Sequence, residues 1–342
     1  MKKIALITIF FILLFSLTLV IYLSFFAPKP LFTSPLTSFE FQKRPPDLKP
    51  YSFENLQKRK YFPSEIKLEK TLEEDSLFTS FLFSYSSEGR KITGMANLPK
   101  KQGTYPVAIL MRGFVDPQSY ITGVGTINMA NFLVQNGFIT LAPDFQGYGG
   151  SDPDYPHQLQ ARFSRPINII VLLNSLENLN KTLDERNLAT VDTQKIVFWS
   201  HSNGGQIALS VLEITGRPIP TSLWAPVSAP FPESILYFTP EMEDEGKSLK
   251  EIVANFEKKY KSKDYSITSF FDQISAPIIL HQGMADEAIP IEWSNNLYKT
   301  LKNLGKDITY YQYPGENHNF NFTRGSSNIA RNRDLNFFKK HL

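Results

Sequence analysis

Cysteine is absent from this sequence of 342 residues, and histidine occurs only five times. Without cysteine the chain can form no disulfide and can carry no lipid on a thiol. The net charge of +3, with no cluster that combines basic and aromatic residues, gives no indication of nucleic-acid binding. Because histidine is so scarce, each one can be weighed separately as a candidate general base.

Strand-like and helix-like patterns alternate along residues 66–342, a length that suits one large α/β domain with a substantial core. The alternation predicts a mostly parallel central sheet with helices on both faces. An antiparallel hairpin, 78–85 with 91–98, is expected to open the domain. Residues 231–264 interrupt the pattern, and we expect a small cap insertion there. Its apolar residues either line an acyl or side-chain pocket or only pack the cap onto the body: Phe231, Ile235, Leu236, Tyr237 and Phe238.

The N-terminus has two lysines followed by an uncharged, mostly apolar run, Ile4–Phe26. As a helix this run is about 35 Å long, enough for a bilayer core of about 30 Å. We expect residues 1–26 to be an uncleaved signal anchor rather than a signal peptide, with the folded domain on the extracytoplasmic side of the membrane. Residues 27–65, with six prolines before residue 51, are expected to be a tether and juxtamembrane segment. A cytoplasmic protein with a buried N-terminal helix is the alternative.

The most informative stretch is Val197–Gly205, with the sequence V-F-W-S-H-S-N-G-G. An apolar strand ends there in small residues, and a helix-like segment follows. This pattern predicts a sharp strand-to-helix turn with Ser202 exposed at its tip, as in the G-x-S-x-G nucleophile elbow of α/β-hydrolases. Ser200 replaces the first glycine, and Gly204 keeps the second. The alternative is a helix N-terminus capped by serine and asparagine.

A serine nucleophile needs a base and an orienting acid, which follow it along the chain in this fold. Asp286 comes just after the apolar strand 277–283, and His318 comes in a turn-rich loop after the strand 307–313. Both positions are strand ends, where open α/β sheets place their sites. The alternatives are a helix-capping aspartate and a solvent-exposed loop histidine.

The other histidines fit the role of base less well. His201 lies inside the elbow and is expected to point away from the position of a base. His281 is on the strand before the acid loop and is expected to be buried and hydrogen-bonded. His157 lies in a polar loop, and His341 lies next to the C-terminus.

An oxyanion hole requires two N–H donors. We expect the backbone N–H groups of Asn203, which follows the nucleophile, and of Phe114, in the loop after the strand 106–111. Arg112 precedes Phe114, and its permanent charge predicts pairing with a carboxylate or with substrate, unless it only extends into solvent. Tyr148 and Trp224 are further candidate substrate contacts.

Five segments together are similar to the catalytic domain of prolyl oligopeptidase-like serine peptidases of the α/β-hydrolase superfamily. They read R-G-F, A-P-D-F-Q-G-Y-G-G-S, W-S-H-S-N-G-G, A-P-I-I-L-H-Q-G-M-A-D-E-A-I-P and L-K-N-L-G-K-D-I-T-Y-Y-Q-Y-P-G-E-N-H-N-F. The resemblance, over residues 78–342, implies a catalytic triad of Ser202, Asp286 and His318, with no metal and no organic cofactor.

The β-propeller that usually precedes this catalytic domain has no room between residues 27 and 77. Relatives without a propeller include many esterases. The sequence therefore predicts a membrane-anchored serine hydrolase acting on a small-molecule or peptide substrate. A peptidase is the first interpretation, a carboxylesterase the second, and a non-catalytic binding module on the same fold the third. The oligomeric state stays open.

Overall fold

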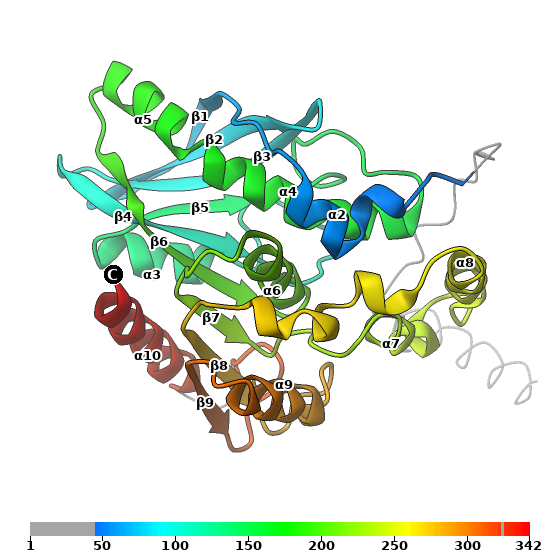
Figure 1. Cartoon of the computed structure of the whole chain (residues 1–342). Coiled ribbons are helices and arrows are strands. Elements are labelled where there is room, and N and C mark those ends of the chain that lie inside the picture. Colours follow the sequence, from blue (N-terminus) through cyan, green and yellow to red (C-terminus); the bar gives the residue numbers. More distant parts are fainter. Residues whose placement is uncertain (1–44, 323–324) are drawn as a thin grey trace, which may run out of the picture.

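The computed structural model describes residues 45–322 and 325–342, which form a twisted nine-stranded sheet flanked by helices (Figure 1). The strand order is β1-β2-β3-β5-β4-β6-β7-β8-β9. Strands β1, β2, β3 and β5 pair antiparallel, and all pairs from β5 to β9 are parallel. The strands are β1 (Ile66–Glu74), β2 (Phe78–Ser87), β3 (Arg90–Pro99), β4 (Thr104–Met111), β5 (Ile139–Pro143), β6 (Thr190–His201), β7 (Thr221–Trp224), β8 (Ile278–Gly283) and β9 (Ile308–Tyr313). The predicted mostly parallel sheet and the antiparallel pairing of 78–85 with 91–98 are confirmed, but β1 precedes this hairpin and pairs with it, so the hairpin does not open the sheet as expected.

Helices cover both faces of the sheet, because successive residues of a strand point to opposite sides. On β4, Ile109 and Met111 lie in a cluster with residues of α4, α5 and α6, whereas Leu110 lies in a second cluster with residues of α3 and α10. The helices are α2 (Phe53–Lys58), α3 (Ile127–Gln135), α4 (Gln158–Asn174), α5 (Leu176–Glu185), α6 (Asn203–Thr215), α7 (Glu233–Leu236), α8 (Lys247–Glu257), α9 (Ile291–Asn303) and α10 (Ser326–His341).

The folded domain begins earlier than the predicted residue 66. Leu48, Phe53 and Leu56 are buried in the main core. The backbone N–H of Leu48 donates to the hydroxyl of Tyr260 at 3.0 Å, which ties this segment to the far side of the insertion. Prolines and charges surround these apolar residues in the sequence, and the short helix α2 gives little periodicity, so the segment resembled a tether.

The predicted anchor, residues 1–26, and the first part of the predicted tether lie outside the described residues. In the part of the chain that the structure describes, no helix combines the length and apolarity needed to cross a bilayer.

The insertion at 231–264 contains α7 and α8, which lie beyond the carboxyl ends of the central strands (Figure 1). Phe231 and Ile235 are buried in the main core, and Leu236 packs against it. Tyr237 and Phe238 pack instead on Trp293 of α9, with ring centroids 5.1 and 6.2 Å from it. Of the two interpretations of these apolar residues, the structure therefore favours packing of the insertion onto the body.

Candidate active site

Ser202 lies between β6 and α6, which confirms the predicted strand-to-helix turn, but it is only 9% exposed, so the expected exposure at the tip was wrong. Its backbone has φ 54° and ψ −120°, a conformation that non-glycine residues rarely adopt. Such a strained residue persists only when its surroundings hold it, and here the Ser202 N–H donates to the carbonyl of Trp224 at 2.9 Å. A side chain at Gly204 would overlap the carbonyl oxygen of Met111, so a glycine is required there. Ser200 is fully buried in place of the first glycine.

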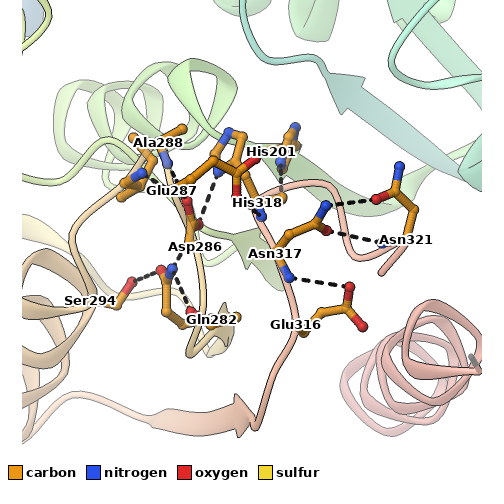
Figure 2. A network of polar contacts seen from close by, with 12 residues as sticks. His201, Gln282, Asp286, Glu287, Ala288, Ser294, Glu316, Asn317, His318 and Asn321 are labelled. Atoms are coloured by element: carbon orange, nitrogen blue, oxygen red, sulfur yellow. Dashed lines mark hydrogen bonds and ion pairs between the residues drawn. The ribbon is translucent and has the colours of Figure 1, made fainter. Parts of the chain in front are cut away.

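The carboxylate of Asp286, just after β8, is held by four donors (Figure 2). Oδ1 accepts the backbone N–H groups of Ala288 and Ile289 at 2.9 and 2.8 Å. Oδ2 accepts the Gln282 side-chain amide at 2.8 Å and His318 Nδ1 at 2.9 Å. Burial alone would raise the pKa of Asp286, but the hydrogen bond and charge of His318 and the two backbone donors outweigh it and lower that pKa. The carboxylate therefore stays ionised.

His318 follows β9 and is 9% exposed. Its Nδ1 is engaged by Asp286, so the ring can present Nε2 to a serine hydroxyl. The loop that carries His318 is bound to the acid loop, since the Ala285 N–H donates to the carbonyl of Glu316 at 2.9 Å. Gly283 permits this close approach, because a Cβ there would overlap the Glu316 carbonyl. Acid and base are thus held in one rigid unit.

His201, the residue before Ser202, lies against His318 of this unit (Figure 2). Its Nε2 lies 3.0 Å from the backbone carbonyl oxygen of His318, and the two rings are in contact, tilted by 39° with centroids 4.5 Å apart. Burial, followed by the charge of His318, lowers the pKa of His201 to about 3, so His201 is neutral and its Nε2–H donates. The expectation that His201 points away from the base was wrong. The residue next to Ser202 contacts His318 directly.

The two expected oxyanion donors belong to residues that flank Ser202 or follow a residue in contact with it. Asn203 is the first residue of α6, whose N-terminus favours negative charge. A Cβ on Gly113 would lie 3.0 Å from the Cβ of Ser202, so Gly113, the residue before Phe114, lies directly against the serine. The N–H groups of Asn203 and Phe114 therefore stay the predicted oxyanion donors.

The three expected substrate contacts are interior residues. Arg112 is 5% exposed, stacks on Tyr148 with 3.9 Å from guanidinium carbon to ring centroid, and donates to the carbonyls of Gly113 and Asp144. Trp224 is 6% exposed and donates from Nε1 to Asp334 at 2.8 Å. These contacts indicate a structural role for Arg112, Tyr148 and Trp224. Arg112 does not extend into solvent, and it forms no ion pair with a carboxylate among the described residues.

Two polar residues near the acid were missed by sequence reasoning. Gln282 is fully buried and links Asp286 to Ser294, whose hydroxyl donates to the side-chain oxygen Oε1 of Gln282 at 2.7 Å (Figure 2). Glu287 accepts the backbone N–H of His318 at 3.2 Å. A signal for Gln282 existed, since it is a polar residue at the end of an otherwise apolar strand run. His281, by contrast, is buried and hydrogen-bonded as predicted, to Asp334 and Tyr313.

Residues 126–342, more than half of the chain, match the model of the prolyl oligopeptidase family. The chain belongs to the prolyl oligopeptidase family. This family member is 24% identical over 244 residues to the uncharacterized peptidase YtmA of Bacillus subtilis (strain 168), an alignment that covers 70% of this chain and 86% of the relative. The resemblance deduced from the motifs is thereby confirmed.

Solved structures confirm the fold of this family member. Acetyl xylan esterase 1 from Thermoanaerobacterium sp. JW/SL YS485 has a TM-score of 0.58 at 15% identity and covers 86% of this chain and 94% of its own. An acylaminoacyl peptidase from Pyrococcus horikoshii has a TM-score of 0.56 at 14% identity, over 83% of this chain and 51% of its own. The likeness shows the α/β-hydrolase fold alone. With its family, the chain is a serine hydrolase.

Proposed function

We propose that this serine hydrolase is a peptidase that forms an acyl-enzyme on Ser202, with His318 as general base and Asp286 as the orienting acid. The observation that carries the proposal is the 2.9 Å hydrogen bond between His318 Nδ1 and Asp286, in a loop bound to the strained serine turn through His201. The family and the relative named as a peptidase favour an amide substrate over an ester.

In the proposed reaction, His318 Nε2 accepts the hydroxyl proton as Ser202 Oγ attacks the substrate carbonyl carbon. The backbone N–H groups of Asn203 and Phe114 stabilise the oxyanion, an effect typically worth about 100- to 1,000-fold in rate for each donor. His318 then gives its proton to the leaving amine as the C–N bond breaks. Water, deprotonated by His318, attacks the acyl-enzyme, releases the acid and restores Ser202. The ionised Asp286 stabilises the imidazolium in both steps.

The test is kcat/KM for an aminoacyl 4-nitroanilide and the matched 4-nitrophenyl ester, measured with the full chain in detergent and with Ser202→Ala. Amide cleavage that disappears in Ser202→Ala supports a peptidase. Hydrolysis of the ester alone makes the protein a carboxylesterase. Turnover of neither substrate by folded protein contradicts the proposal and favours a non-catalytic binding module.

We further propose that residues 1–26 anchor the protein as a single membrane pass with the hydrolase domain outside the cytoplasm. The apolar run after Lys2 and Lys3 supports this orientation through the positive-inside tendency. Membrane fractions washed with high salt and then with detergent provide the test. Release by detergent only is expected, and release by salt alone would contradict the anchor.

A further inference from the structure

Three arginines near the candidate active site differ in how well their donors are paired. Arg112 donates to two backbone carbonyls and stacks on tyrosine rings, and among the described residues only its Nε lacks a hydrogen-bond partner. Arg165 forms an ion pair with Asp154 at 2.8 Å. Arg162, one turn before Arg165 on α4, forms no ion pair within residues 45–322 and 325–342. Among the described residues it is therefore a cation without an ion-pair partner, and the proposed mechanism gives it no role.

The contacts of Arg162 place it beside the oxyanion donor. Its Nη1 donates to the side-chain oxygen of Asn203 at 3.3 Å. Its Nε and Nη2 are buried and have no hydrogen-bond partner among the described residues. Burial and the repulsion from Arg165 lower the pKa of Arg162 to about 9, so the guanidinium is still charged at neutral pH. Burying unpaired charged donors is unfavourable, which calls for an acceptor that arrives from outside the chain.

The unpaired atoms identify the kind of acceptor. Nε–H and one Nη2–H lie on the same edge of the planar guanidinium and point in parallel. This edge is the fork that binds the two oxygens of a carboxylate in a bidentate pair. The contact with Asn203 is long and therefore weak, and Arg162 as a whole is half-buried and not fully enclosed.

We propose that Arg162 binds a carboxylate on the acyl part of the substrate, a few bonds from the carbonyl that Ser202 attacks. The enzyme then prefers acyl groups that carry a second, free carboxylate over neutral acyl groups of the same length. This inference rests on the proposed function, because it assigns the substrate class of the same site.

The test compares kcat/KM for 4-nitrophenyl hydrogen adipate and for 4-nitrophenyl hexanoate, which have the same chain length and differ in the terminal carboxylate. Both are measured with the full chain, Arg162→Met and Arg162→Lys, and the rate with Ser202→Ala is subtracted as background. Arg217→Met is the matched control, since Arg217 is an exposed arginine just beyond the opposite end of α6.

We expect the parent protein to prefer the adipate ester by at least about 10-fold, in line with a charge-assisted bidentate pair. Arg162→Met should remove this preference and leave kcat/KM for the hexanoate ester within about 3-fold of the parental value. Arg162→Lys should retain part of the preference for the adipate ester, and Arg217→Met should retain all of it. Equal loss on both esters would show that Arg162 acts on the oxyanion and would overturn the inference. Absence of a preference in the parent would overturn it too. The proposed function itself would be rejected by a different result, namely that the parent protein hydrolyses neither ester in a Ser202-dependent way.

Discussion

The molecule contains two histidine–aspartate pairs of nearly the same geometry and very different surroundings. His318 and Asp286 are 2.9 Å apart at the carboxyl edge of the sheet, and His281 and Asp334 are also 2.9 Å apart. Both side chains of the second pair are fully buried, whereas His318 keeps 11% of its side chain exposed. A histidine–aspartate hydrogen bond is therefore not sufficient for catalysis. The histidine must also be accessible to substrate and lie beside a nucleophilic serine.

The two aspartates also differ in what they hold. Asp334, on α10, accepts from the Ser222 hydroxyl and the Trp224 ring N–H at 2.7 and 2.8 Å, in addition to His281. It thereby fastens α10 to β7 and β8. Asp286 accepts mostly from its own loop and from His318. The His281–Asp334 pair should thus mainly affect stability, and the His318–Asp286 pair should mainly affect the catalytic rate. Mutations in each pair can separate these two effects.

The largest expected effect is on rate. Asp286→Asn removes the charge that stabilises the imidazolium and disturbs the tautomer of His318, so kcat should fall about 10⁴-fold, as for the corresponding change in serine proteases. Steady-state kinetics and thermal unfolding on the same preparation check this. A variant that retains more than about a tenth of the parental kcat would remove Asp286 from the proposed triad.

The buried pair should give the opposite result. Asp334→Ala leaves three buried donors unpaired, which is expected to lower the free energy of unfolding by about 3–5 kcal/mol. Activity per folded molecule, determined by active-site titration, should stay within about 3-fold. Asp184→Ala, an exposed position at the end of α5, is the control and should be near-neutral. A large drop in kcat with unchanged stability would make the second pair catalytic after all.

A smaller effect is expected at the contact that joins the serine turn to the base. His201→Phe keeps the ring against His318 but loses the hydrogen bond to its carbonyl, so kcat should fall about 10- to 100-fold through misplacement of the base, with little change in KM. His201→Gln retains a donor at a similar reach and should recover most of the rate. Equal losses in both variants would show that ring packing, and not the hydrogen bond, matters.

The smallest effect concerns pH and stability. The pKa of Asp286 is lower in the folded protein than in the unfolded chain, where it is about 3.9. Its ionised form therefore adds stability that is fully present above that unfolded value and is lost as the pH falls through the folded value. The stability difference between the parent and Asp286→Asn should shrink as the pH falls below about 4. Denaturant unfolding at several pH values checks this, and a difference independent of pH would contradict it.

Features that depend on where strands end and on the order of motifs along the chain could be predicted from the sequence. The turn at Ser202, the loops of Asp286 and His318, and the parallel sheet all follow from apolar runs that end in small or turn-forming residues. Contacts between distant segments were not predictable in this way. His201 touches His318, more than a hundred positions later, and Trp224 is drawn inward by Asp334 on the last helix. Their local sequence contains neither partner.

The start of the domain was missed for a different reason. Helix α2 is six residues long, too short for a clear helical period, and its apolar residues become informative only when α6 and the insertion pack against it. Arg162 was also overlooked, because an arginine on a helix is usually solvated, and only the structure shows that its nitrogens are buried without partners.

The most direct test of the central claim is covalent labelling with a fluorophosphonate, followed by intact-mass measurement and peptide mapping. The account predicts one label per chain, on Ser202, that is absent in Ser202→Ala, much slower in Asp286→Asn and unchanged per folded molecule in Asp334→Ala. A label on another serine, or folded protein that stays unlabelled, would contradict the assignment of Ser202, His318 and Asp286 as the catalytic triad.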